Sequence, residues 1–158
     1  GIHVVGHGRE QPGARVSTRP AYSGTVGRMT VPFVCVFLAA LLIYVPRIFV
    51  VVAQARMPGG LDNKDPRGQQ AQLTGWGKRA QGAHLNAFEA FAPFAAAVFV
   101  SHLGGANPSH AAMLAIGFVA LRCVYTALYL ANLDRLRSSV WMLGLAAVVA
   151  LFVSPWLA

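Results

Sequence analysis

Four long apolar stretches, separated by polar segments, dominate the hydropathy pattern of the chain. A helix rises about 1.5 Å per residue, and about 20 apolar residues therefore cross a hydrocarbon core of about 30 Å. Each stretch is long enough for one crossing. The pattern predicts an all-α membrane protein, a bundle of four transmembrane helices at residues 31–53, 77–102, 109–132 and 138–157.

Local signals place turns and bends within this pattern. Pro46 is expected to bend the first helix, because proline has no backbone N–H to donate. Asn107 and Pro108 suit the N-cap and first position of the third helix. The fourth helix holds no ionisable residue, and we expect a structural role for it, facing lipid or packing through small residues.

Composition agrees with a membrane protein. Of 158 residues, 56% are hydrophobic and 11% charged, beyond the apolar content of typical soluble domains. The formal net charge of +8 would suggest nucleic acid in a soluble protein, but the basic residues here fall in the tail and between helices. We therefore expect no nucleic acid partner. Residues 1–28 are polar and rich in Gly and Arg, and we expect a disordered tail or an extension there.

The basic residues also predict an orientation. The first and third loops, with the helix ends beside them, hold Arg56, Lys64, Arg67, Lys78, Arg79, Arg135 and Arg137. The second loop and the C-terminus hold none. By the positive-inside rule, the first and third loops are cytoplasmic and both termini lie on the opposite side, as expected of a bacterial inner membrane protein.

Two helices carry a polar face into the membrane. On the second helix, side chains at steps of three and four share the face Arg79, Gly82, Asn86, Glu89 and Pro93. On the third helix, the same steps give Arg122, Tyr125 and Tyr129. Ionisable groups in hydrocarbon are costly and usually functional, which makes these two faces the candidate site.

Counting the helical rise from the cytoplasmic ends places Glu89 at a depth of about 16 Å and Arg122 at about 15 Å. We expect the two to form a direct ion pair at the base of a polar crevice with a basic mouth. Such a crevice suits a small polyanionic ligand from the cytosol. The alternative is that these polar groups only join the helices. His84 lies off the polar face, and we expect a structural role for it and no metal site.

Two segments resemble the MAPEG family of membrane proteins in eicosanoid and glutathione metabolism. They are AHLNAFEAFAPF with the upstream Arg79, and RCVYTALY followed by Leu136 and Arg137. The resemblance covers about residues 29–158. It implies a homotrimer of four-helix subunits that binds glutathione between adjacent subunits on the cytoplasmic side, together with membrane lipids and a lipophilic small-molecule substrate.

The resemblance also implies roles for single residues. Asn86 and Glu89 match the family pattern on the second helix, and Tyr125 and Tyr129 match the tyrosine pair on the third. Arg137 best matches the arginine that stabilises the glutathione thiolate. The chain departs from the pattern at Gly82, where an arginine is expected, at Ala90, where an aromatic residue is frequent, and in a spacing from Tyr129 to Arg137 that is one residue longer. Arg79, one turn earlier, is the expected substitute for the missing arginine.

The chemistry follows from these residue types. A neighbouring guanidinium lowers the pKa of a thiol from about 8.5 toward neutrality, because it favours the thiolate. The thiolate then attacks an electrophile or a peroxide that arrives through the bilayer. The candidate catalytic residues are Arg137, Tyr125 and Tyr129. The candidate glutathione-binding residues are Arg79, Asn86, Glu89, Arg122, Arg47 and Arg135.

The sequence therefore favours a glutathione transferase or peroxidase that acts on lipophilic substrates. One alternative is a non-catalytic relative that binds lipid or a partner protein through the same crevice. Another is a small proton-coupled exporter with Glu89 as its carrier carboxylate, which conflicts with an ion pair that would hold this group ionised.

Overall fold

The computed structural model describes residues 29–158, and all regular structure in that range is helical. The predicted tail at 1–28 lies outside the described residues. The elements in chain order are α1 (Val31–Leu42), α2 (Tyr44–Ala55), α3 (Pro66–Ala71), α4 (Gly75–Leu103), α5 (Pro108–Leu130), α6 (Asp134–Val153) and the 3₁₀ helix η1 (Ser154–Leu157).

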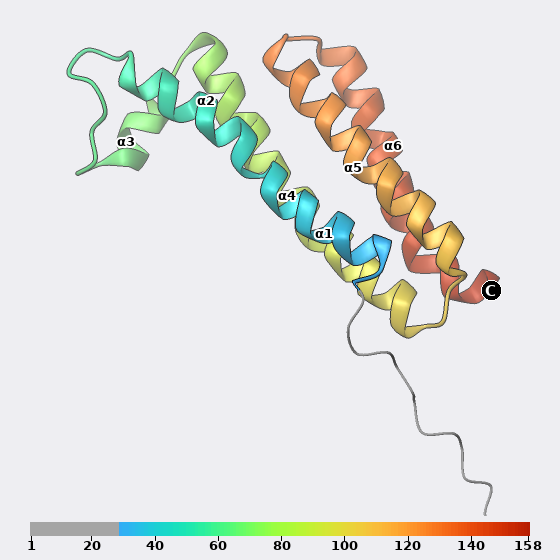
Figure 1. Ribbon diagram of the computed structural model, residues 1–158. Helices are drawn as coiled ribbons and strands as arrows, with labels where there is room; N and C mark the ends of the chain where they lie inside the picture. The colour runs from blue at the N-terminus through green and yellow to red at the C-terminus, as the bar shows by residue number, and fades with distance from the viewer. Residues whose placement is uncertain (1–28) are drawn as a thin grey trace, which may run out of the picture.

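Four helical segments of the described chain are long and apolar enough to cross a membrane: Val31–Ala55, Gly75–Leu103, Pro108–Leu130 and Asp134–Leu157. Figure 1 shows α1 and α2 alongside α4, and α5 alongside α6. The α2–α4 connection and the α5–α6 turn lie at one end of the bundle, here called the loop end. The α4–α5 turn and the C-terminus lie at the other end.

The first span is interrupted at Ile43, between α1 and α2. The break comes just before Pro46, because proline offers no N–H to the carbonyl of Leu42, four residues earlier. His84 reaches this point from α4, and its Nδ1 lies 2.9 Å from the carbonyl oxygen of Ile43. Since a carbonyl only accepts, Nδ1 carries the proton. His84 is buried, and its structural role is confirmed.

Turn chemistry sets the two tight connections. The side chain of Asn107 accepts from the backbone N–H groups of Ser109 and His110, at 3.0 and 3.3 Å, and so caps α5 as predicted. At the loop end, Asn132 takes a positive φ of 62°, which reverses the chain at once. As a result, α5 ends at Leu130 and α6 begins at Asp134, four residues earlier than the predicted start at 138.

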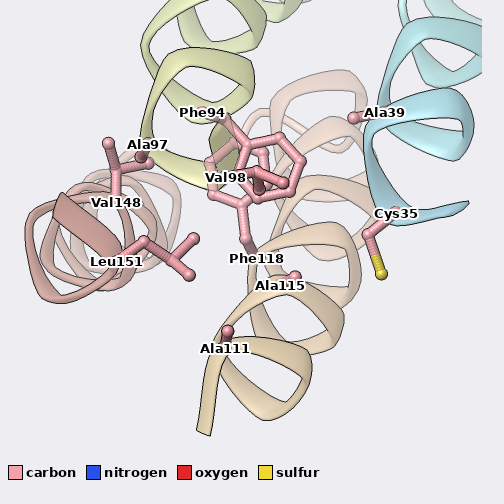
Figure 2. Packing of buried hydrophobic residues seen from close by; sticks show 10 residues of the cluster. All are labelled: Cys35, Ala39, Phe94, Ala97, Val98, Ala111, Ala115, Phe118, Val148 and Leu151. Atoms are coloured by element: carbon pink, nitrogen blue, oxygen red, sulfur yellow. The ribbon is translucent and has the colours of Figure 1, made fainter. Parts of the chain in front are cut away.

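An apolar cluster fills the half of the bundle away from the loop end. Phe94 and Phe118 are stacked with ring centroids 4.0 Å apart and planes 12° apart. Figure 2 shows this pair between α6 and α1, surrounded by Cys35, Ala39, Ala97, Val98, Ala111, Ala115, Val148 and Leu151. Alanine on α4 and α5 lets the helices approach closely. The predicted polar faces, with Asn86 and Arg122, lie toward the other half.

Candidate functional site

The register between α4 and α5 decides which polar residues meet. Near the loop end, Arg79 Nε donates to the carbonyl oxygen of Leu130 at 3.3 Å, at the C-terminal end of α5. Two turns deeper, Arg122 Nη2 donates to Oδ1 of Asn86 at 2.8 Å. The predicted polar faces of the two helices therefore face each other, and Asn86 is the direct partner of the buried Arg122.

The predicted ion pair between Glu89 and Arg122 is wrong. No pair of opposite charges within 4.0 Å joins them; instead Asn86 lies between, accepting from Arg122 and donating to Oε2 of Glu89 at 3.5 Å. The depth count took Lys78 and Asn132 as level with each other. In the structure Arg79 bonds to Leu130, and Arg122 bonds to Asn86 rather than to Glu89, which lies three residues, about one turn, further along α4. Glu89 is exposed rather than buried.

Aromatic rings lead from Arg122 and its neighbours Asn86 and Glu89 toward the loop end. The guanidinium carbon of Arg122 lies 4.3 Å from the ring centroid of Tyr125. Tyr125 meets the ring of Tyr129 edge to face, at 5.7 Å and 71°. The guanidinium carbon of Arg137 lies 4.3 Å from the ring centroid of Tyr129. These four side chains form a continuous row, here called the Arg–Tyr row, in which each cation lies over a ring.

Two cavities open beside the row. The first, the polar cavity, measures about 400 Å³ and is lined by Asn86, Tyr125, Arg137, Ser138, Trp141 and Met142. The second, the apolar cavity, measures about 260 Å³ and is lined by Asn86, Glu89, Ala90, Pro93, Phe118, Arg122, Trp141, Gly144, Leu145 and Val148. Asn86 and Trp141 line both, and the two cavities therefore meet at these residues.

The fourth helix exposes most of its large apolar side chains and buries Gly144, in keeping with the prediction. Beyond that prediction, α6 side chains line both cavities, and Trp141 stands where the cavities meet. Trp141 was not predicted to line the site, because it carries no ionisable group. The spacing held a usable signal: Arg137, Trp141, Gly144 and Val148 repeat at steps of four and three, and so share one face of α6.

Three arginines predicted to bind ligand lie outside the cavities. Arg47 donates to the side-chain oxygen of Gln70 on α3, at 2.6 Å in the amide orientation that satisfies both groups. Arg79 bonds to the end of α5, as above, and Arg135 is exposed on the first turn of α6. The two cavities therefore collect Asn86, Glu89, Arg122, Tyr125 and Arg137, but not Arg47, Arg79, Arg135 or Tyr129.

A family model described as the MAPEG family matches residues 31–157, which includes all four spans. The chain belongs to the MAPEG family. Neither the curated proteins nor the solved structures gave a match.

Membership supports a role related to glutathione in the membrane. MAPEG proteins include glutathione transferases and peroxidases that use glutathione as a substrate, and also members without catalytic activity. In this MAPEG chain, Asn86, which matches the family pattern on α4, accepts a hydrogen bond from Arg122 on α5.

Proposed function

We propose that this MAPEG protein is a glutathione transferase or peroxidase for lipophilic substrates. Glutathione binds in the polar cavity, with its thiolate beside Arg137, and the lipophilic partner enters the apolar cavity from the bilayer. The loop end faces the cytoplasm, where glutathione is available and where the basic loops are retained.

The observation that carries this proposal is the meeting of two cavities, one beside Arg137 and one that has apolar walls beyond Asn86, Glu89 and Arg122. The polar cavity holds Arg137, Tyr125 and the amide of Asn86, which can bind anionic and amide groups. The apolar cavity carries Glu89 and Arg122 beside Asn86, and its other walls are Phe118, Val148 and further apolar side chains. Two substrates of opposite solubility can thus be held side by side, with their reacting atoms brought together near Asn86 and Trp141.

The residues suit glutathione, which carries two carboxylates, an amine, amides and a thiol. The Arg137 side chain makes no hydrogen bond or ion pair to another described residue, and its donors are therefore free for an anion. Glu89 offers a carboxylate for the amine. In one subunit the cations at the cavities are Arg122, already bonded to Asn86, and Arg137. A second carboxylate therefore needs a cation from a neighbouring copy.

Glu89 also supports assembly as a homotrimer. It lies at the midpoint of α4 and is exposed in the single subunit, at a depth where a bare carboxylate facing lipid would be costly. A neighbouring subunit that covers this face removes the carboxylate from lipid and closes the open side of both cavities. The proposed glutathione site then lies between subunits.

The transferase reaction needs no redox partner. The thiolate attacks an electrophilic carbon, the carbon–sulfur bond forms, and the leaving group departs with its electron pair. The bound thiol has already lost its proton to solvent, and Arg137 stabilises the negative charge on sulfur until the bond forms. With a lipid hydroperoxide, two glutathione molecules are oxidised to the disulfide while the hydroperoxide is reduced to an alcohol and water.

The proposal is tested by calorimetric titration of the detergent-purified protein with glutathione, alongside a mass measurement of the oligomer and conjugation of a chlorinated dinitrobenzene. We expect saturable binding, a trimer and turnover. Neither binding nor turnover with the electrophile or with a lipid hydroperoxide would refute the proposed function.

Trp141 is expected to set the size of the lipophilic substrate. Replacing it with alanine joins the two cavities, so that the ratio of kcat/KM for a bulky over a small electrophile should rise about tenfold. Trp156→Ala is the matched control, because Trp156 is 81% exposed at the opposite end of the bundle. A size preference that is the same in both variants would contradict this assignment.

The rival proposal is a non-catalytic MAPEG relative that binds lipid or a partner protein. It is favoured by the small number of free cations at the cavities, since position 82 is glycine and Arg47 and Arg79 are bonded elsewhere. Its signature is a copurified lipid in the apolar cavity together with no glutathione-induced thermal shift.

A further inference from the structure

Tyr129 is packed between α4 and α6 in a way that depends on glycine at position 82. A Cβ atom at Gly82 would lie 2.8 Å from Cζ of Tyr129 and closer still to its hydroxyl oxygen. Any other residue would force the ring to move, because these contacts are shorter than carbon side chains tolerate. The hydroxyl end of Tyr129 thus rests against the backbone of α4.

The ring of Tyr129 also contacts a cation, the guanidinium of Arg137. The guanidinium of Arg137 lies over the Tyr129 ring at 4.3 Å, and this is its one recorded polar interaction among the described residues. Arginine prefers such a ring face, which restricts its many rotamers. The edge-to-face contact with Tyr125 fixes the ring from a third direction.

The two tyrosines are not equivalent. Tyr125 lines the polar cavity, whereas Tyr129 does not. The Tyr129 hydroxyl lies against Gly82 and not at the lining of this cavity. Tyr129 acts on this cavity indirectly, because its ring supports Arg137, which lines the cavity.

We propose that Tyr129, seated on Gly82, is a positioning residue that holds the Arg137 guanidinium at the polar cavity through its ring rather than through its hydroxyl. This inference rests on the proposed function in one respect: the anion that meets Arg137 is the glutathione thiolate. It also accounts for glycine at position 82. An arginine there would displace the ring that supports Arg137 and would bring a second cation close to it.

Three variants test the proposal: Tyr129→Phe, Tyr129→Leu and Gly82→Ala. Phenylalanine keeps the ring and should retain most of the wild-type kcat/KM and its pH profile. Leucine removes the ring, and we expect kcat/KM to fall about tenfold and the half-maximal rate to move to higher pH, because Arg137 no longer favours the thiolate. Gly82→Ala should resemble leucine. If Gly82→Ala fails to fold, the two Tyr129 variants still test the positioning role of the ring.

A second readout does not need glutathione. The rate at which phenylglyoxal modifies Arg137, followed by peptide mass mapping, should rise several-fold in Tyr129→Leu and stay at the wild-type value in Tyr129→Phe. If the wild type neither binds nor conjugates glutathione, the proposed function fails, while these modification rates still test the positioning. A phenylalanine variant that behaves like leucine in both assays would overturn the inference, as would a leucine variant that behaves like wild type.

Discussion

Replacing Arg137 with alanine is expected to lower kcat/KM for conjugation at least about 100-fold, the usual cost of removing a group that stabilises a developing or resting anion at a reaction centre. Arg137 is the free cation at the polar cavity in each subunit, since Arg122 is bonded to Asn86. Without it the thiol of bound glutathione stays protonated near neutral pH. The measurement is the rate of conjugation across pH, and the rising limb should move to higher pH in the variant.

Two further variants separate position from charge. Arg137→Lys keeps the charge but not the planar group that lies over Tyr129, and it should recover part of the rate. Lys78→Ala removes one positive charge from the exposed surface at the same end of the bundle and should leave the rate near wild type. If Arg137→Ala retained turnover within about threefold of wild type, the thiolate would not depend on this cation.

The fold was largely predictable because hydrophobic length and turn chemistry are local. The four spans followed from runs of apolar residues, and the start of α5 from Asn107 and Pro108. The start of α6 was missed because Asn132 completes a turn in one residue, and such a tight connection has no apolar signature. A single residue in the left-handed region moved a helix start by one turn.

The sequence predicted which helix face carries each site residue, but not which residues of the two helices lie at the same level. Spacing alone placed Asn86 and Glu89 on one helix face, and Arg122 with Tyr125 on another. Which of them meet depends on how far one helix slides along the other, and Arg122 meets Asn86 instead of Glu89, which lies one turn further along α4. Such an alignment comes from packing between helices, for example the bond from Arg79 to Leu130, and leaves no trace in either helix alone.

The part played by α6 was missed for a related reason. A ligand cavity needs apolar walls as much as charges, and Trp141 and Val148 supply them without any ionisable group. Arg47 is the opposite case. This arginine in an apolar run was predicted to bind ligand, but in the structure it bonds to Gln70 and holds α3 against the first span.

Asn86→Leu is expected to be the most damaging single change to both stability and ligand binding. It keeps the size of the side chain but leaves the guanidinium of Arg122, which is 7% exposed within a membrane span, without its 2.8 Å acceptor. An arginine without a partner at such depth costs about 2 to 3 kcal/mol. The thermal unfolding midpoint in detergent should fall clearly. Glutathione affinity should also fall, since Asn86 lines both cavities.

The double variant Asn86→Leu with Arg122→Met separates the two effects. Removing the charge together with its acceptor leaves no unpaired buried group, and apolar replacement of a buried polar pair is often neutral or stabilising. The double variant should therefore unfold nearer the wild-type temperature than Asn86→Leu alone does, while glutathione binding stays lost. This outcome would assign the Asn86–Arg122 contact to the ligand site and not only to joining α4 and α5. If the double variant bound glutathione as the wild type does, the contact would be structural, and the ligand site would have to lie elsewhere.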